Sequence, residues 1–339
     1  MKYLFLFFIF LTCSYATPSW YYNIQNKQPQ TIIGYGSGKD ENTAKQNALS
    51  DVVSKISTTI DTSMKILQRD DNGQVVQNSE YISNQKAKGV LNDYKLLKVE
   101  YEDGEFFVAV SYENIPSFDK FVRKVQQSSS FNHANKSTVK TVPPRGYLSY
   151  TPMAKKLKKT LKSEIDFKLL RRDKKWYIKY KTVLQTLDKK DFARFFVTVP
   201  NKNLSINTNK RDNILFDGDR FYFKVKSKRS GYISILTVYE DGTVSSLVRN
   251  IPIKPNKIEK IPDEEFESIP EAGLIKKGIE TYDLYICIFS KKRLHFESFA
   301  YADDELINEE KYKNFDELIE FLDRKIYTTL KVVTKPRLR

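Results

Sequence analysis

The chain has 339 residues, with 57 Lys or Arg against 42 Asp or Glu, so its formal net charge is +15 at pH 7. The many aromatic residues, 22 Phe and 21 Tyr, argue against a disordered chain. Two Cys exclude a scaffold held by several disulfides. The basic balance predicts attraction to polyanions.

Residues 1–16 have the order of a cleavable secretory signal peptide. A positive charge at Lys2 precedes an apolar run at 4–11, and the small residues Ser14 and Ala16 mark a cleavage point. The run is much shorter than the roughly 20 residues of a spanning helix. We therefore expect a processed protein in the periplasm or associated with the outer membrane.

The two cysteines bear on anchoring and on stability. Acylation of Cys13 would tether the mature protein, but Phe10 and Thr12 depart from the residues that usually precede a lipidated cysteine. We favour a soluble product and leave lipidation of Cys13 open. Cys287 then remains as the single thiol, which excludes an intrachain disulfide, and its apolar surroundings predict a place in the core.

Residues 17–125 are predicted to form a small α+β domain with the order β-β-α-β-β-β-α. Short strands are expected at 20–22 and 31–33, and further strands around the Asp103-Gly104 turn. A long helix capped by Asp40 buries a stripe with a four-residue repeat, and a second helix follows Pro116. The first stripe consists of Ala44, Ala48, Val52, Ile56 and Ile60.

Three glycines precede the first helix, at Gly34, Gly36 and Gly38. Their G-x-G-x-G spacing fits neither the dinucleotide fingerprint nor the P-loop, and Asp40 with Glu41 would repel a phosphate. We expect the glycines to form a tight turn from strand to helix. No nucleotide or other cofactor is predicted.

The polar stretch 126–145 ends in a Pro pair and is predicted to be a linker. A basic middle module is expected at 146–200, with a helix after Pro152 and a hairpin at 167–180. Residues 201–339 alternate strand and turn patterns, which predicts a mainly antiparallel β domain, a sandwich or barrel, closed by a terminal helix near Phe315. The fold class is therefore α+β.

The basic module carries the strongest candidate site. Its lysines and arginines surround aromatic residues, as expected for a surface that docks onto an anionic polymer, a headgroup or an acidic partner. A solvated face without a ligand is the alternative. The candidate partner-binding residues are Lys155, Lys156, Lys158, Lys159, Lys162, Arg171, Arg172, Lys174, Lys175 and Trp176.

Signatures of catalysis are weak. His133 lies in the linker and His295 in a strand-like segment, and none of the common catalytic or zinc motifs occurs. Asp217 and Asp219 flank a glycine as ordinary turn formers, so no metal is expected there. The open alternative is an envelope hydrolase acting on peptidoglycan, which would need two converging carboxylates. They would come from Asp217, Asp219, Asp263, Glu264 and Glu265.

Two resemblances add to these patterns. Trp20, the segment Gly34–Asp40, the helix with Ala44 and Ala48, and the strands ending near Tyr112 resemble the twenty-kilodalton outer-membrane lipoprotein family of Helicobacter, whose relatives include flagellar accessory proteins. Residues 215–299 are similar to an uncharacterised β-rich domain of secreted bacterial proteins. Neither resemblance implies catalytic residues, and both imply binding or assembly in the cell envelope.

The expected function is therefore that of an exported, non-enzymatic binding or assembly protein of the envelope. Envelope proteins or anionic envelope polymers are the predicted partners, and nucleic acid is not. Peripheral association with the outer membrane, a flagellar role and a homo-oligomer are all compatible with the sequence, which does not choose among them.

Overall fold

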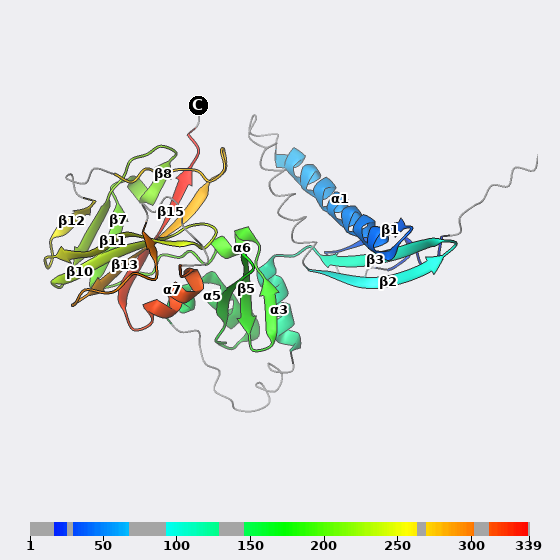
Figure 1. Ribbon diagram of the computed structural model, residues 1–339, viewed down its shortest axis with the longest axis horizontal. Coiled ribbons are helices and arrows are strands. Elements are labelled where there is room, and N and C mark those ends of the chain that lie inside the picture. Colours follow the sequence, from blue (N-terminus) through cyan, green and yellow to red (C-terminus); the bar gives the residue numbers. More distant parts are fainter. Residues whose placement is uncertain are drawn as a thin grey trace, which may run out of the picture. The chain divides into compact units, whose positions relative to one another are not determined.

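The computed structural model describes residues 17–25, 30–67, 93–128, 146–262, 269–301 and 312–337, with side chains in α1 up to residue 58. The predicted signal peptide and most of the predicted linker lie outside these residues. The chain divides into two compact units, which we call unit 1 (residues 1–114) and unit 2 (residues 115–339). Figure 1 shows the elements of each, and together they confirm the α+β class.

Unit 1 is a three-stranded antiparallel sheet covered on one face by a long helix. Its sheet order is β1-β3-β2, so the last strand in the sequence is central. The hairpin between β2 and β3 turns at Asp103-Gly104, both with positive φ, as the sequence predicts. The elements are β1 (Thr31–Gly38), α1 (Glu41–Leu67), β2 (Tyr94–Glu102) and β3 (Glu105–Glu113).

The glycines do not form a turn, because all three lie within strand β1. Gly34 and Gly36 are two residues apart and therefore face the same side of the sheet, the side covered by α1. There the backbone of Ala48 lies against the backbone of the strand. A Cβ added at Gly34 would lie 2.2 Å from the Ala48 carbonyl oxygen, and one at Gly36 would lie 2.2 Å from the Ala48 amide nitrogen. The glycine spacing therefore removes side chains where the helix touches the sheet, and the prediction of a turn was wrong.

The predicted helix stripe is confirmed where side chains are described. Ala44, Ala48, Val52 and Ile56 are all buried, and Asp40 caps the helix by accepting a hydrogen bond from the Thr43 amide at 2.9 Å. The segment at 20–22 is a turn rather than a strand. Among the described residues, unit 1 thus has the order β-α-β-β, with one strand fewer on each side of the helix than predicted.

A polar stripe on α1 bonds the free edge of β1. Asn47 donates to the Ser37 carbonyl at 2.8 Å, Asp51 accepts from the Tyr35 amide at 2.9 Å, and Lys55 donates to the Ile33 carbonyl at 2.8 Å. These side chains recur every four residues along the helix, and the outward backbone groups that they satisfy recur every two residues along the edge strand. We call Asn47, Asp51 and Lys55 the edge stripe.

Helix α3 (Ser117–Gln127) begins unit 2, although the sequence predicted it as the last helix of the first domain. The helix after Pro116 is confirmed, and its buried face has Phe118, Phe121 and Val125 fully enclosed. That face packs on the middle of the chain, and the Phe118 amide donates to the buried Asp191 carboxylate at 3.0 Å. The boundary between the compact units therefore lies at residue 114 rather than 125.

The middle of the chain forms a second small sheet with order β4-β5-β6, covered by α3 and α5. The predicted helix and hairpin are confirmed, and a third strand follows them. The hairpin turns at Asp173 and Lys174, both with positive φ. The elements are η1 (Gly146–Tyr150), α5 (Pro152–Leu161), β4 (Lys168–Arg172), β5 (Lys175–Tyr180), β6 (Val183–Thr186) and α6 (Lys189–Ala193).

The remainder of unit 2 is a two-sheet sandwich. A six-stranded sheet with order β14-β11-β10-β13-β15-β8 faces a three-stranded sheet with order β12-β9-β7. Its pairs are antiparallel except β11 with β14 and β15 with β8. The elements are β7 (Leu204–Thr208), η2 (Arg211–Asn213), β8 (Ile214–Phe216), β9 (Phe223–Ser227), β10 (Gly231–Val238), β11 (Val244–Ile253), β12 (Ile258–Ile261), β13 (Thr281–Ser290), β14 (Ala300–Tyr301), α7 (Phe315–Leu322) and β15 (Ile326–Lys335).

Both faces of the six-stranded sheet are buried. Along β13, Leu284, Ile286 and Ile288 join the core shared with the middle of the chain, whereas Tyr285 and Cys287 point into the sandwich. A strand covered on both faces is apolar throughout, which explains the unbroken run at 284–289. The predicted basic module and β domain therefore share one core, and Cys287 is buried there as expected.

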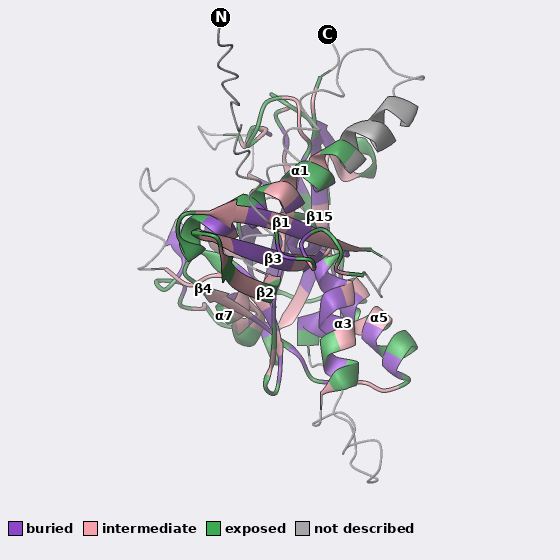
Figure 2. Cartoon of the chain, turned by 90° about the vertical axis from the view of Figure 1, so that its right-hand side faces the viewer, coloured by how far each residue is buried: buried purple, intermediate pink, exposed green. Residues whose placement is uncertain are grey.

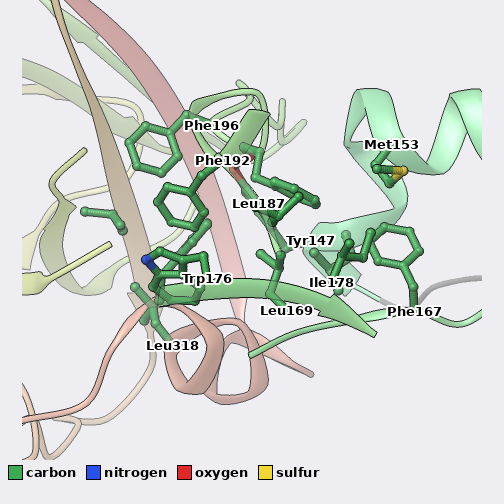
Figure 3. Close-up of a cluster of buried hydrophobic side chains, with 14 of the residues drawn as sticks. Tyr147, Met153, Phe167, Leu169, Trp176, Ile178, Leu187, Phe192, Phe196 and Leu318 are labelled. Carbon is green, nitrogen blue, oxygen red and sulfur yellow. Dashed lines mark hydrogen bonds between the residues drawn. The ribbon is translucent and has the colours of Figure 1, made fainter. Parts of the chain in front are cut away.

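Helix α7 matches the predicted closing helix, but strand β15 follows it and enters the six-stranded sheet between β13 and β8. Phe315, Leu318 and Leu322 of α7 are buried in the shared core. Figure 3 shows Leu318 of α7 beside Trp176 of β5. The helix thus closes the core between the two sheets rather than ending the fold.

Candidate functional site

Helix α5 presents part of the predicted basic site. Thr151 caps its first turn, Pro152 starts it, and Lys162 ends it in the left-handed conformation with φ of 52°. Met153 and Leu157 face the core, so the lysines take the opposite side, and Figure 2 shows buried and exposed residues on the same helix. The exposed members of the predicted site on α5 and its C-cap are Lys155, Lys158, Lys159 and Lys162.

Two lysines of this helix have carboxylate partners. Lys156 pairs with Asp119 of α3 at 2.5 Å and is about one-third exposed, so it links the two helices that cover the small sheet. Lys158 pairs with Glu164 at 2.6 Å. Surface pairs of this kind contribute roughly 0–1 kcal/mol, but they reduce the positive charge that the helix offers to a ligand.

Trp176 belongs to the core and cannot line a docking surface. Its ring stacks on Phe192 with centroids 4.5 Å apart (Figure 3). Its Nε1 donates to the Asp241 carbonyl at 2.7 Å. Gly242, with φ of 85°, leaves room for the indole, because a Cβ there would lie 2.2 Å from Cζ2 of Trp176. The assignment of Trp176 to partner binding is therefore corrected: the residue joins the hairpin to the β10–β11 turn.

Arg171 is also engaged within the fold. Its backbone amide donates to the Asp316 carboxylate of α7 at 3.1 Å, and its guanidinium hydrogen-bonds Asn314. The guanidinium also lies 5.9 Å from the centroid of the Trp176 ring. Arg171 thus shares the inner side of the hairpin with Trp176 and fixes the first turn of α7 against β4.

The outer side of the same sheet carries exposed cations. Alternation along the strands places Lys168, Leu170 and Arg172 of β4, and Lys175, Tyr177 and Lys179 of β5, on the side away from the core. We call these six residues the outer basic face. Lys168 and Lys179 were missed as site residues, although strict alternation through the predicted hairpin would have grouped them with Arg172 and Lys175.

The predicted site is therefore divided. The lysines of α5 project from the helix layer, whereas Arg172 and Lys175 project from the far side of the sheet layer that α5 covers. Lys174 lies at the hairpin turn. Side chains that leave opposite sides of a two-layer structure do not form one patch, so the two groups are separate candidates.

Two of the carboxylates proposed for the hydrolase alternative, Asp217 and Asp219, form hydrogen bonds and ion pairs within the fold. Asp219 accepts from the Phe216 amide at 2.9 Å and pairs with Arg337 at 2.8 Å, and Asp217 accepts from the Leu274 amide at 3.3 Å. Both are thus engaged by neighbouring groups in the way expected of turn formers. The other three candidates, Asp263, Glu264 and Glu265, lie outside the described residues.

A different pair of acids was missed by sequence reasoning. The buried Glu240 follows β10 and interacts with Asp283 of β13, where desolvation and then the charge of Glu240 raise the pKa of Asp283 to about 7. Glu240 also forms an ion pair with Lys189 and accepts from the Tyr282 amide at 3.2 Å. The two acids lie over 40 residues apart in the sequence, so no local motif reveals them.

Other reactive groups are either enclosed or dispersed. Burial raises the pKa of the Cys287 thiol, which keeps it protonated. His295 is exposed and lies 3.5 Å from Glu297. Within the described ranges, no group of three or more His, Cys, Asp or Glu is placed to hold a metal ion, and no helix combines the length and apolar character needed to cross a bilayer.

Comparisons with known proteins identify the class of the first unit. Residues 18–113 match the family model of the LPP20 lipoprotein, which confirms the resemblance predicted from Trp20, the segment Gly34–Asp40, the helix that follows it and the strands ending near Tyr112. This match supports the coarser expectation of an exported, envelope-associated protein. The matched range ends one residue before the boundary between the two units.

Among solved structures, the chain is similar to the secreted protein HP1454 from the human pathogen Helicobacter pylori. The two share 18% sequence identity with a TM-score of 0.19, over 40% of this chain and 49% of that one. The chain thus spans about half the length of that protein. No curated protein matches the chain.

Proposed function

We propose that the protein is a non-enzymatic binding or assembly protein of the bacterial cell envelope, exported through a cleaved signal peptide. The observation that carries this proposal is the match of residues 18–113 to the LPP20 lipoprotein family. The matched range coincides with a compact unit of the chain, which contains the glycine strand and the helix packed on it. Unit 2 then supplies the surface through which partners bind, and association with the outer membrane or with flagellar structures belongs to this proposal.

Fractionation of cells that produce the full chain tests it. We expect the processed protein in the periplasmic or outer-membrane fraction, and a Cys13→Ala variant should fractionate in the same way because lipidation is not needed for export. Recovery of the unprocessed chain in the cytosol would contradict the proposal. Crosslinking of intact envelopes followed by mass spectrometry then identifies the bound partner.

The enzymatic alternative now rests on Glu240 and Asp283, because a carboxyl group whose pKa is raised beside a second carboxylate is suited to act as a general acid. Incubation of the protein with purified peptidoglycan distinguishes the two functions. We expect no release of soluble fragments by the wild-type chain. Release that is lost in a Glu240→Gln variant would establish the hydrolase instead.

A further inference from the structure

We propose that the outer basic face of the β4–β5–β6 sheet docks onto the surface of a membrane that contains anionic phospholipids. This inference rests on the proposed envelope function. It names the surface of the protein that binds and the chemical class of the ligand. The outer basic face consists of Lys168, Leu170, Arg172, Lys175, Tyr177 and Lys179. Leu184 of β6 extends it, because it is paired with Lys179 across the sheet.

Cations on this face lie directly opposite each other. The register pairs Lys168 with Lys179 and Arg172 with Lys175, so both charged pairs of the β4–β5 ladder combine like charges. Such pairs destabilise a sheet, whereas a Lys opposite a Glu would stabilise it. A face that keeps Lys168 directly opposite Lys179 is therefore organised for an external anion rather than for stability.

Carboxylates are scarce within the strands and turns of this sheet. Residues 168–186 contain seven Lys or Arg and a single acid, Asp173, which lies at the hairpin turn. Within the part of the chain that the structure describes, the side chains of Lys168, Arg172 and Lys179 form no ion pair. Their charge is thus available to headgroup phosphates, for which each basic residue near an anionic membrane contributes about 1 kcal/mol.

Apolar groups between the cations distinguish a membrane from a soluble polyanion. Leu170 and Tyr177 form the cross-strand pair between the two charged pairs, and Leu184 is 38% exposed. A soluble polyanion gives such side chains nothing to bury against. The lipid interface accommodates both, because Tyr rings and leucines sit at headgroup depth while Lys and Arg reach the phosphates.

The spacing of the charges suits several headgroups at once. The two charged pairs are four residues apart along the strands, which corresponds to roughly 14 Å at about 3.4 Å per residue. The cations can therefore bind the phosphates of more than one headgroup on a flat surface. Because the strands are also braced from behind by Trp176 and Ile178, the face meets the membrane as a preformed plane.

Binding to vesicles by the full chain tests this inference. The probes are vesicles of phosphatidylethanolamine with phosphatidylglycerol, vesicles of phosphatidylcholine alone, and soluble polyphosphate. A triple variant, Lys168→Gln with Arg172→Gln and Lys179→Gln, should bind the anionic vesicles on the order of 100-fold more weakly at low salt. Wild-type binding should weaken as salt rises and be absent on phosphatidylcholine.

The matched control removes the same charge from the other layer of the module. Lys155→Gln with Lys159→Gln and Lys162→Gln also deletes three cations that form no described ion pair, and it should change vesicle affinity by less than about threefold, since those lysines lie off the docking plane. Leu184→Asn should weaken vesicle binding without affecting polyphosphate. A charge-preserving variant, Lys168→Arg with Arg172→Lys and Lys179→Arg, should retain binding and so exclude misfolding as the cause.

Several outcomes overturn the inference. Equal losses of vesicle affinity in the two triple variants would mean that net charge alone causes the binding. Unchanged vesicle binding after Leu184→Asn, together with tight binding of polyphosphate, would indicate a soluble polyanion as the ligand. If the wild-type chain does not bind anionic vesicles but still fractionates with the envelope, membrane docking is refuted and the proposed function is not. A cytosolic location would instead refute the proposed function.

Discussion

The two units bring their layers together in opposite ways. In unit 1, side chains are absent at the contact, so the backbone of α1 lies on the backbone of β1 at Gly34 and Gly36. In unit 2, the six-stranded sheet is separated from the helices by large rings, including Trp176, Phe192 and Phe315. The first contact excludes any added atom, whereas the second depends on filling a large volume. The two units should therefore fail under opposite kinds of substitution.

The largest effect is expected from removing volume in unit 2. Trp176→Ala should lower the free energy of unfolding of unit 2 by about 3–5 kcal/mol, because it leaves a cavity where the indole stacks on Phe192 and frees the hydrogen bond to Asp241. Urea-dependent hydrogen exchange of the β13 amides measures this value. Tyr177→Ala, at the next residue but on the outer face, is the control and should cost no more than about 1 kcal/mol. Similar losses in both variants would contradict the packing described.

Adding volume in unit 1 should have the next largest effect. Gly36→Ala places a methyl group against Ala44 and Ala48 of α1, so we expect a loss of about 3 kcal/mol, measured by hydrogen exchange of the β3 amides. Gly273→Ala in unit 2 is the control for a methyl group added where nothing lies within 4 Å of the new Cβ, and the free energy of unfolding of unit 2, measured by exchange of the β13 amides, should change by less than about 0.5 kcal/mol. A neutral Gly36→Ala variant would show that helix and strand do not touch.

The smallest effect concerns the edge stripe. Asp51→Ala leaves the Tyr35 amide without its hydrogen bond to the carboxylate and removes the Asp51–Lys55 ion pair, which should cost unit 1 about 1 kcal/mol. Ser50→Ala, exposed on the same helix turn, should be neutral within about 0.5 kcal/mol. The exchange rate of the Tyr35 amide reports the change directly, and unaltered protection in Asp51→Ala would mean that the edge is shielded in another way.

Local periodicity was sufficient wherever one element determines its own buried face. The α1 stripe, the α3 face and the Asp103-Gly104 and Asp241-Gly242 turns are all readable from neighbouring residues. The glycines of β1 were misassigned because their role depends on Ala48 of α1, which contacts them only after folding. The same limit explains the boundary at residue 114, since nothing in α3 itself shows that its partner is Asp191.

The candidate site was predictable in composition but not in arrangement. The candidate Lys and Arg residues from 155 to 175 were recognised as a group, but the periods of helix and strand place them on different sides of the module. Trp176 was misassigned because a tryptophan beside cations is compatible with an interface as well as with a core. Only its contact with Gly242, which the fold creates, shows that it belongs to the core. Glu240 and Asp283 come together through the β10–β13 register, which no single segment encodes.

The close fit between Trp176 and Gly242 also bears on binding thermodynamics. Association costs about 0.5–1.5 kcal/mol for each long side chain that is immobilised, and more if the backbone must become ordered as well. Here the β4–β5 hairpin is held by an indole enclosed beneath it, so folding has already removed its backbone freedom. When a ligand binds on the opposite side of the hairpin, the remaining entropic cost is that of immobilising the ends of the lysine and arginine side chains. Weak individual contacts can then add up to useful affinity.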